Sequence, residues 1–499
     1  MPDPDLMASW RFVLGDELVA FLLGASPGAP SAVDDQAAVG VLRWLSSNVE
    51  RLEREDPRLP VALVRATADG LPLAWALRRQ AGGDVPDPDT AASDAVERHL
   101  ARIARDTFPL LLAPSGRMLT AGPGRALPAA DPEIGLVQVA DGHTSAAALS
   151  AALDAEGLTR VAGAFATAMT VSSLAEVSVD SLMSAAALRF RHVPERSAQA
   201  FMARAADVLE QLRAAAAGET AQVPALIGFV SLSLPPATEL TLPQGRLRVA
   251  APGERRYAPL SVLADSVLET TVTARRVEPG GDSGTTQADG QMLLNRLARE
   301  VCLATALGCP DVVPQSCPAV AWVTELSPIG GQGAFRPLHP AQPPPGRRAP
   351  MADHEIAGLE RWAAKVAGAD LSHVQIAVDR LLRALWEMEW TESLIDAVIA
   401  WESLLGTRLE TSFRVTAALA KLCEHDVSRR LAVRKRLETI YNARSRLVHG
   451  DVPDGKLHEH RASAIDVALD ALRRLIRDRP DLLALPKSSE RADRLLLDI

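Results

Sequence analysis

The stretch Tyr-Asn-Ala-Arg-Ser-Arg-Leu-Val-His-Gly, residues 441–450, decides how the rest of the chain is interpreted. At helical spacing Leu437, Ile440 and Val448 fall on one face, which predicts an amphipathic helix that packs on a core. Arg444 lies on that same apolar face. Because an arginine without a partner is costly in such a place, we expect an anionic group beside it.

The same stretch closes with His449 and Gly450. Glycine suits the position just past the end of a helix. His449 would then lie at the negative end of the helix dipole, where a protonated imidazole is favoured. A permanently charged guanidinium near an imidazole that titrates close to neutrality suits the binding and cleavage of a phosphodiester.

Composition and charge describe a folded globular protein. The chain has 499 residues, of which 47% are hydrophobic, and this length predicts two to four domains. Its net charge of −9 argues against a general nucleic-acid coat protein. Residues 429–446, however, hold seven basic residues and one acid, and we expect Lys435, Arg436 and Arg446 to touch RNA. A solvated helix face explains the same pattern without RNA.

No metal, cofactor or membrane segment is expected. Cys302, Cys309 and Cys317 are separated by seven and eight residues and form no CxxC pair, so zinc is not predicted. His458 and His460 are interpreted as surface residues. The sequence has no convincing signal peptide and no uninterrupted run of 18 apolar residues. A cytoplasmic protein is therefore the expectation.

The fold class predicted is α+β, with a mixed N-terminal region followed by an all-α bundle. Residues 1–220 are expected to be mainly helical, with helices near 36–54, 91–106, 146–155 and 198–217 and a hairpin at 108–120. Residues 221–330 are expected to be β-rich, with strands near 225–234, 238–242, 247–251, 268–277 and 319–323 and one helix at 292–306. Residues 331–351, rich in proline and glycine, are predicted to be a linker.

Residues 352–499 show the most regular pattern. Apolar residues at helical spacing predict six consecutive helices, with Phe413 among the residues that mark the fourth and with the last one ending before Pro480. The connections between them are short. Consecutive helices should therefore pack antiparallel, as an up-and-down helical bundle.

Residues 370–480 resemble the HEPN superfamily, in particular its Apea-like branch. The segment Leu394–Leu405, which includes Glu402, and the segment 444–450 carry the resemblance, and the second matches the family's pattern of an arginine and a histidine separated by four to six residues. The resemblance implies a metal-independent endoribonuclease in which two copies pair and bring both motifs into one cleft. RNA would be its substrate and a homodimer its assembly.

The resemblance also implies roles for individual residues. Arg444 would bind the scissile phosphate, and His449 would act as general acid and base while the 2′-hydroxyl attacks phosphorus. Ser445 stands where the family often has Asn, Asp or His. Asn442 and Ser445 precede His449 by seven and four residues and could orient its ring from the same helical face. Glu402 is a candidate partner for Arg444, and Tyr441 is expected to pack beside them.

Three functions remain open at this stage. The first is a HEPN-type ribonuclease, a toxin or antiphage-defence effector whose N-terminal region senses a trigger ligand or protein. The second is a noncatalytic HEPN module for dimerisation or RNA binding, in which Arg444 and His449 are structural. The third places an enzyme within residues 1–330, where we find no P-loop, GxSxG or dinucleotide-binding motif.

Overall fold

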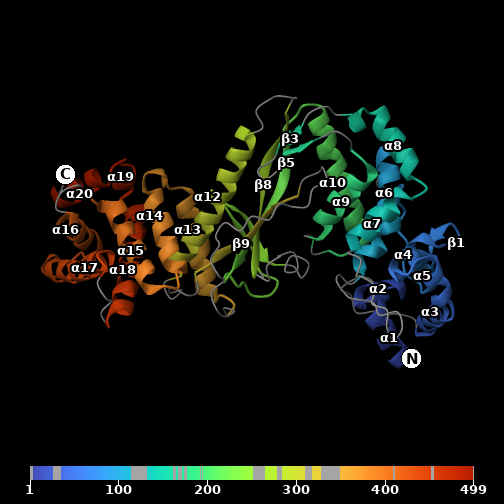
Figure 1. Ribbon diagram of the computed structural model, residues 1–499, viewed down its shortest axis with the longest axis horizontal. Helices are drawn as coiled ribbons and strands as arrows, with labels where there is room; N and C mark the ends of the chain where they lie inside the picture. The colour runs from blue at the N-terminus through green and yellow to red at the C-terminus, as the bar shows by residue number, and fades with distance from the viewer. Residues whose placement is uncertain are drawn as a thin grey trace. The chain divides into compact units, whose positions relative to one another are not determined.

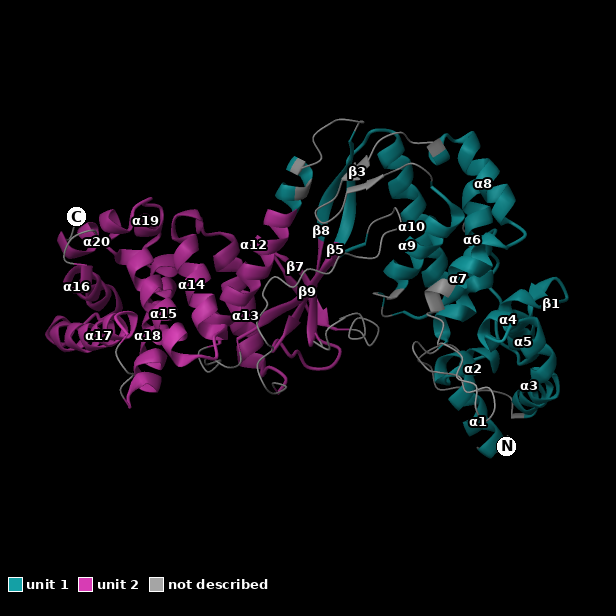
Figure 2. Ribbon diagram, in the orientation of Figure 1, with its two compact units in different colours: residues 1–224, 271–290, 325–334 teal, residues 225–270, 291–324, 335–499 magenta. Residues whose placement is uncertain are grey.

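A computed structural model shows a mixed α+β protein dominated by helices (Figure 1). The structure describes residues 4–25, 35–90, 92–113, 132–160, 164–166, 171–173, 177–191, 193, 195–250, 264–277, 284–309, 317–326, 349–407, 411–450 and 455–497. The chain divides into two compact units (Figure 2). Unit 1 comprises residues 1–224, 271–290 and 325–334, and unit 2 comprises residues 225–270, 291–324 and 335–499.

Unit 1 is built mainly from short helices around an aromatic cluster. Its elements are α1 (Pro4–Leu14), α2 (Asp16–Leu22), α3 (Asp35–Glu55), α4 (Leu59–Arg65), the two-stranded β1 (Thr67–Ala68) and β2 (Leu71–Pro72), α5 (Leu73–Gln80), α6 (Ala95–Thr107), η1 (Phe108–Leu112), α7 (Pro132–Asp141), α8 (Ala146–Ala155), η2 (Leu158–Arg160), α9 (Val179–Arg191) and α10 (Ala198–Ala216). Phe108 contacts Phe21, Trp75, Phe190 and Phe201 at ring-centroid distances of 5.7–6.5 Å. Rings from five separate elements thus meet at one residue and form the core of this unit.

The central strands form a sheet in the order β4-β3-β8-β5-β9, and β7 pairs with both β6 and β8. The strands are β3 (Ala164–Ala166), β4 (Val171–Ser173), β5 (Ala221–Val230), β6 (Glu239–Leu242), β7 (Gly245–Val249), β8 (Ser266–Val277) and β9 (Ala319–Glu325). The pairs β3–β4, β3–β8, β6–β7 and β7–β8 are antiparallel, with Leu240 opposite Leu247 and Leu247 opposite Leu268. The β-rich character predicted after residue 220 is therefore confirmed.

One element of the N-terminal region was predicted wrongly. Residues 108–112 form the 3-10 helix η1 instead of the first strand of a hairpin, and residues 114–120 of that hairpin lie outside the described part of the chain. All five residues of η1 are buried, and Pro109 occupies its first turn. A proline there fits a helical turn because its φ is fixed and the N–H it lacks would have no partner.

Unit 2 contains the C-terminal helices, shown in orange to red in Figure 1. They are α13 (Asp353–Ala367), η3 (Ser372–Val374), α14 (Gln375–Trp386), α15 (Trp390–Leu405), α16 (Thr411–Cys423), α17 (Val427–Val448), α18 (Leu457–Arg477), α19 (Pro480–Leu483) and α20 (Ser488–Leu497), with α12 (Gly284–Gly308) extending into this unit. All six predicted helices are present, and α18 ends before Pro480 as expected. The short helices α19 and α20 were not predicted.

Helices that follow one another in the chain also contact one another from α14 to α18, and α15 touches α14, α16, α17, α18 and α20. The α17–α18 pair runs antiparallel. Arg436 of α17 donates to Ser463 near the start of α18 at 2.8 Å, whereas His425, just before α17, lies 2.6 Å from Arg474 near the end of α18. The predicted linker lies almost wholly outside the described residues.

Two arginines cap the C-terminal ends of helices in this unit. Arg491 of α20 donates to the carbonyl oxygens of Ser403 and Leu404 in the last turn of α15, at 2.9 and 2.7 Å. Arg473 of α18 donates to the carbonyls of Ala306 and Leu307 at the end of α12. The last carbonyls of a helix have no partner within it and carry its negative dipole end, so a guanidinium satisfies them in both respects.

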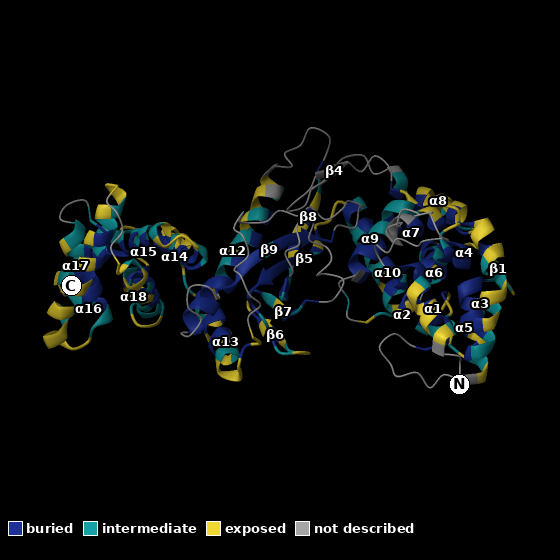
Figure 3. Ribbon diagram, turned by 60° about the horizontal axis from the view of Figure 1, so that its bottom comes forward, coloured by how far each residue is buried: buried dark blue, intermediate teal, exposed yellow. Residues whose placement is uncertain are grey.

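Burial differs sharply between the helices of the bundle (Figure 3). Helix α15 buries nine of its residues, Trp401 among them, and the indole of Trp401 donates to the carbonyl oxygen of Ala464 at 3.0 Å. Helix α17 buries only Leu437, Ile440 and Ala443. Val448, placed on the core face by its spacing, is 52% exposed because it lies in the last turn of α17. Helix α17 is therefore a surface helix with one narrow buried stripe.

Candidate functional site at the end of helix α17

Helix α17 ends where the sequence predicts. Val448 is its last residue and His449 is the C-cap, whose N–H donates to the carbonyl oxygens of Ser445 at 3.2 Å and Arg446 at 3.1 Å. Gly450 has φ of 90°, and its N–H donates to the carbonyl of Leu447 at 3.0 Å. The left-handed conformation explains a glycine at this position. His449 therefore lies at the negative end of a helix of 22 residues.

Arg444 has the anionic partner that its place on an apolar face requires. One of its terminal nitrogens, Nη2, lies 3.7 Å from Oε2 of Glu402 on α15. The other carboxylate oxygen of Glu402 accepts a hydrogen bond of 2.6 Å from the hydroxyl of Tyr441. Two residues of α17 thus hold one carboxylate of α15, and the predicted pairing of Arg444 with Glu402 is confirmed.

Burial and the Glu402 carboxylate raise the pKa of Tyr441 to about 12. Burial disfavours the phenolate, and the adjacent negative charge disfavours it further. The hydroxyl therefore remains protonated and continues to donate to Glu402 at neutral pH. Tyr441 acts here as a support for the carboxylate, in agreement with the packing role expected for it.

Arg444 keeps unused hydrogen-bonding capacity. Its side chain is 19% exposed. Its Nε is buried and has no hydrogen-bond partner within the part of the chain that the structure describes. A guanidinium presents five N–H donors, and a contact of 3.7 Å is an ion pair rather than a hydrogen bond. Arg444 therefore has N–H donors that its ion pair with Glu402 does not occupy.

His449 is exposed and lies on a different face of α17 from Arg444. Five residues of helix correspond to about 7.5 Å along the axis and roughly 140° around it. Arg444 faces α15 and His449 faces solvent. A single copy of α17 thus presents the two groups in different directions, and Asn442 and Ser445 lie on the side of His449.

The predicted RNA-contacting residues differ in how they are held. One terminal nitrogen of Arg436 donates a hydrogen bond to the Ser463 hydroxyl. Lys435 and Arg446 are exposed. Sequence reasoning missed a neighbouring pair, in which Arg434 covers the ring of Phe413 with 4.9 Å between Cζ and the ring centroid. Phe413 was expected to mark the buried face of α16, but it is 55% exposed.

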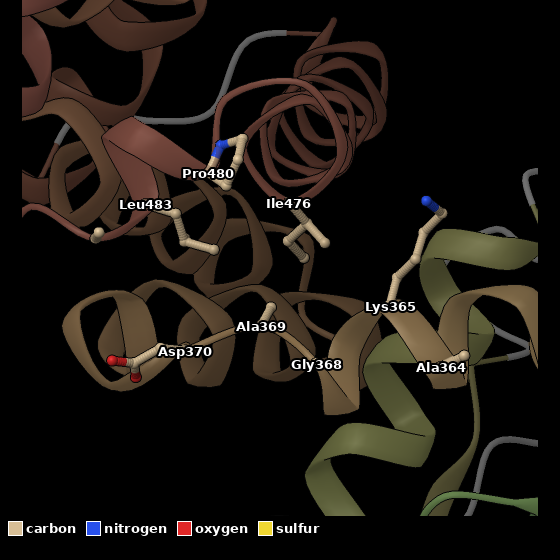
Figure 4. Close-up of a pocket in the computed structure, with 9 residues that line it drawn as sticks. Ala364, Lys365, Gly368, Ala369, Asp370, Ile476, Pro480 and Leu483 are labelled. Atoms are coloured by element: carbon tan, nitrogen blue, oxygen red, sulfur yellow. The ribbon is translucent and has the colours of Figure 1, made fainter.

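A pocket elsewhere in unit 2 contains none of the predicted residues (Figure 4). It has a volume of about 250 Å³ and lies between the end of α13 and the α18–α19 junction. Ile476 and Leu483 face Ala369 across it, whereas Asp370 points away. Its lining residues are Ala364, Lys365, Gly368, Ala369, Asp370, Ile476, Pro480, Leu483 and Ala484. The apolar lining offers no constellation of catalytic groups.

Residues weighed for metal binding in the sequence all lie in the described ranges. The rings of His458 and Trp390 form an edge contact with their centroids 5.0 Å apart. Cys302, Cys309 and Cys317 are buried, and burial raises the pKa of the Cys302 thiol well above its ordinary value. Among the described residues, no group of three or more His, Cys, Asp or Glu side chains could hold a metal ion.

No known protein family model matches this chain, and no curated protein or solved structure does so either. Within the described ranges, no helix combines the length and apolar character needed to cross a membrane.

Proposed function

We propose that this chain is a HEPN-type, metal-independent endoribonuclease that cleaves RNA by attack of a 2′-hydroxyl. The observation that carries the proposal is the Glu402-held guanidinium of Arg444, five residues before an exposed histidine that caps the same helix. Arginine binds phosphate oxygens through two parallel N–H donors, and histidine transfers protons near neutral pH. Neither task requires a metal ion.

In the proposed reaction, Arg444 binds the non-bridging oxygens of the scissile phosphate. One imidazole removes the proton of the 2′-hydroxyl, whose oxygen forms a bond to phosphorus. The bond from phosphorus to the 5′-oxygen breaks, and a second imidazole gives that oxygen a proton. The products are a 2′,3′-cyclic phosphate and a 5′-hydroxyl.

A second copy of the chain supplies the second imidazole in this proposal. Arg444 and His449 of one copy leave α17 on different faces. Antiparallel pairing of two such helix ends would let the Arg444 of each copy meet the His449 of the other. Glu402 and Tyr441 would act as positioning residues that hold the guanidinium in place.

In the cell we propose a toxin or defence effector, with the N-terminal region restraining the nuclease until a trigger binds. The support is chemical, since a nuclease with no substrate restriction harms its host.

A noncatalytic role in dimerisation or RNA binding is the alternative, and one observation favours it. Arg444 already has a carboxylate partner and is mostly buried. An ion pair of this kind is sufficient to fix α17 on α15 without any chemistry. In that case Arg444 and His449 would contribute to stability alone.

Purified full-length protein incubated with total RNA in excess EDTA distinguishes the two functions. Cleavage is expected for the wild type, together with a loss of about 10²- to 10⁴-fold in initial rate for both His449→Ala and Arg444→Ala. His373→Ala is the matched control, because His373 is an exposed histidine in η3 of the same unit. An RNA with a 2′-deoxy nucleotide at the cleaved position should resist.

Two results would contradict the nuclease. Cleavage that persists in His449→Ala, or that EDTA abolishes, assigns the activity to another group or to a contaminant. The noncatalytic module is supported if the wild type does not cleave RNA and if expression of the wild type and of both variants is equally non-toxic.

A further inference from the structure

The exposed phenylalanine of α16 forms an unusual surface with α17. Phe413 is 55% exposed, and the guanidinium of Arg434 covers one side of its ring at 4.9 Å. Arg434 also lies 3.5 Å from Oε2 of Glu438, one turn further along α17. A guanidinium over a ring is held there by the ring's negative face. The rest of the ring remains open to solvent.

The residues of α17 that neighbour Arg434 in the sequence are mainly basic and apolar. Lys435 is exposed, Arg429 is 74% exposed as a side chain and lies 3.4 Å from Asp426, and Leu431 is 59% exposed. Glu438 is the one acid among residues 429–446. The surface thus combines an open aromatic ring with positive charge, a combination that suits a flexible polyanion with flat bases.

The bundle offers a second exposed aromatic residue in the opposite surroundings. Trp390 is 45% exposed and packs on His458. Three acids, Glu387, Glu389 and Glu392, lie within three residues of it in the sequence. Exposure of an aromatic ring alone therefore does not identify a nucleic-acid surface on this bundle. The basic residues of α17 near Arg434 distinguish the Phe413 site from the Trp390 site.

We propose that Phe413 and Arg434 form a stacking platform for a base of single-stranded RNA. The inference relies on the proposed function only in naming RNA as the polyanion. Bases of an unpaired strand stack on aromatic rings and on guanidinium planes, whereas those of a duplex are not available for such contacts. The platform therefore selects unpaired RNA.

The distance along α17 between the platform and His449 determines how many nucleotides of RNA would connect the two sites. Fifteen residues of α17 separate Arg434 from His449. They span about 22 Å and bring the two positions to within roughly 60° of the same helix face. A stacked strand rises about 3.4 Å per nucleotide, so the platform lies roughly six nucleotides from the bond that His449 would reach.

Fluorescence anisotropy of the full-length His449→Ala protein tests this inference without cleavage. The probes are labelled oligoadenylate of about 12 nucleotides, which exceeds the inferred span, and an RNA duplex of equal length. Single strands should bind more tightly than the duplex. Adding Phe413→Ala should weaken single-strand binding about 5- to 100-fold, whereas Trp390→Ala, the matched control, should leave it unchanged.

Two further measurements, the salt dependence of RNA binding and the RNA affinity of Glu438→Gln, make the test more specific. Phe413→Ala should lower affinity without changing the slope of log K against log salt, whereas Lys435→Ala should reduce that slope by about one. Glu438→Gln removes the acid beside Arg434 and should tighten binding. Because a damaged fold does not tighten binding, this variant remains informative even if Phe413→Ala unfolds.

The inference is overturned if no RNA binds, if duplex binds as tightly as single strands, if Phe413→Ala in a folded protein binds like its parent, or if Glu438→Gln does not tighten binding. The two proposals can fail separately. If the wild type binds RNA through Phe413 but never cleaves it, the nuclease proposal fails and the platform proposal stands. If the wild type cleaves RNA and Phe413→Ala binds RNA as tightly as its parent, the platform proposal fails and the nuclease proposal stands.

Discussion

Two arginines reach the same turn of helix α15 and are held in opposite ways. Arg491, 1% exposed, donates to the carbonyl oxygens of Ser403, Leu404 and Leu485 at 2.9, 2.7 and 2.6 Å. Arg444 meets the neighbouring Glu402 through a side-chain contact of 3.7 Å, and its Nε has no partner among the described residues. Each nitrogen of the Arg491 guanidinium donates to an acceptor, whereas Nε of Arg444 does not.

The difference in how the two guanidinium groups are held suggests different roles, stability for Arg491 and ligand binding for Arg444. A buried charge is stable only when its donors are satisfied, and Arg491 meets this requirement through backbone groups that cannot move away. Arg444 is attached to a single carboxylate that Tyr441 also holds. In the proposed function, the guanidinium with unoccupied donors is the one that binds a phosphate while Glu402 holds it in place. The comparison thus predicts that Arg491 governs stability and Arg444 governs ligand binding.

The strongest test of this contrast is Arg491→Ala. The change leaves three carbonyls without their donor, two of them in the last turn of α15, and opens a cavity in the bundle. We expect a loss of about 3–5 kcal/mol in the free energy of unfolding of the bundle. Arg444→Ala should cost only about 1 kcal/mol. Urea unfolding followed by circular dichroism compares the two variants, and equal losses would refute the distinction.

Glu402→Gln should have a smaller effect on stability, and it tests the Arg444–Glu402 ion pair without changing Arg491. The amide still accepts the Tyr441 hydrogen bond but no longer neutralises the guanidinium. We expect a loss of about 1 kcal/mol in stability. If Arg444 binds RNA, its uncompensated charge should at the same time increase the dependence of RNA affinity on salt. A change in stability with no change in salt dependence would assign the pair to structure only.

The sequence was sufficient to predict six helices within residues 352–499 and the Arg444–Glu402 pair. An arginine among apolar residues at helical spacing signals a missing anion by its cost alone. The end of α17 was equally predictable, since a glycine after the last turn satisfies a local backbone requirement. Local patterns with a local physical cause were predicted correctly.

The contacts that the sequence could not reveal are those between distant segments. Arg491 reaches Leu404 across 87 residues, and nothing in the periodicity near Arg491 indicates a carbonyl partner. Phe413 fits a helical apolar stripe, yet it lies on the surface because Arg434 of another helix covers it instead of the core. The turn Phe108–Leu112 was mistaken for a strand because a short, fully buried apolar run has the same pattern in both structures.

The smallest expected effect concerns Tyr441, which holds the same carboxylate of Glu402 as Arg444. Its pKa is raised to about 12 from an ordinary value of 10. A raised pKa in the folded state means that the folded protein holds the proton more tightly than the unfolded chain. The resulting stability is therefore fully present below pH 10 and is lost as the pH rises towards 12.

Tyr441→Phe removes both the hydroxyl and this dependence. At neutral pH we expect a loss of about 1 kcal/mol, the usual cost of one hydrogen bond to a carboxylate that keeps another partner. The difference in unfolding free energy between wild type and variant should then shrink as the pH passes from 10 towards 12, because Tyr441 of the unfolded wild-type chain loses its proton in this range while the folded protein retains it. A difference that stays constant over this range would mean that the hydroxyl does not support Glu402, and Arg444 would then be the only residue of α17 that holds this carboxylate.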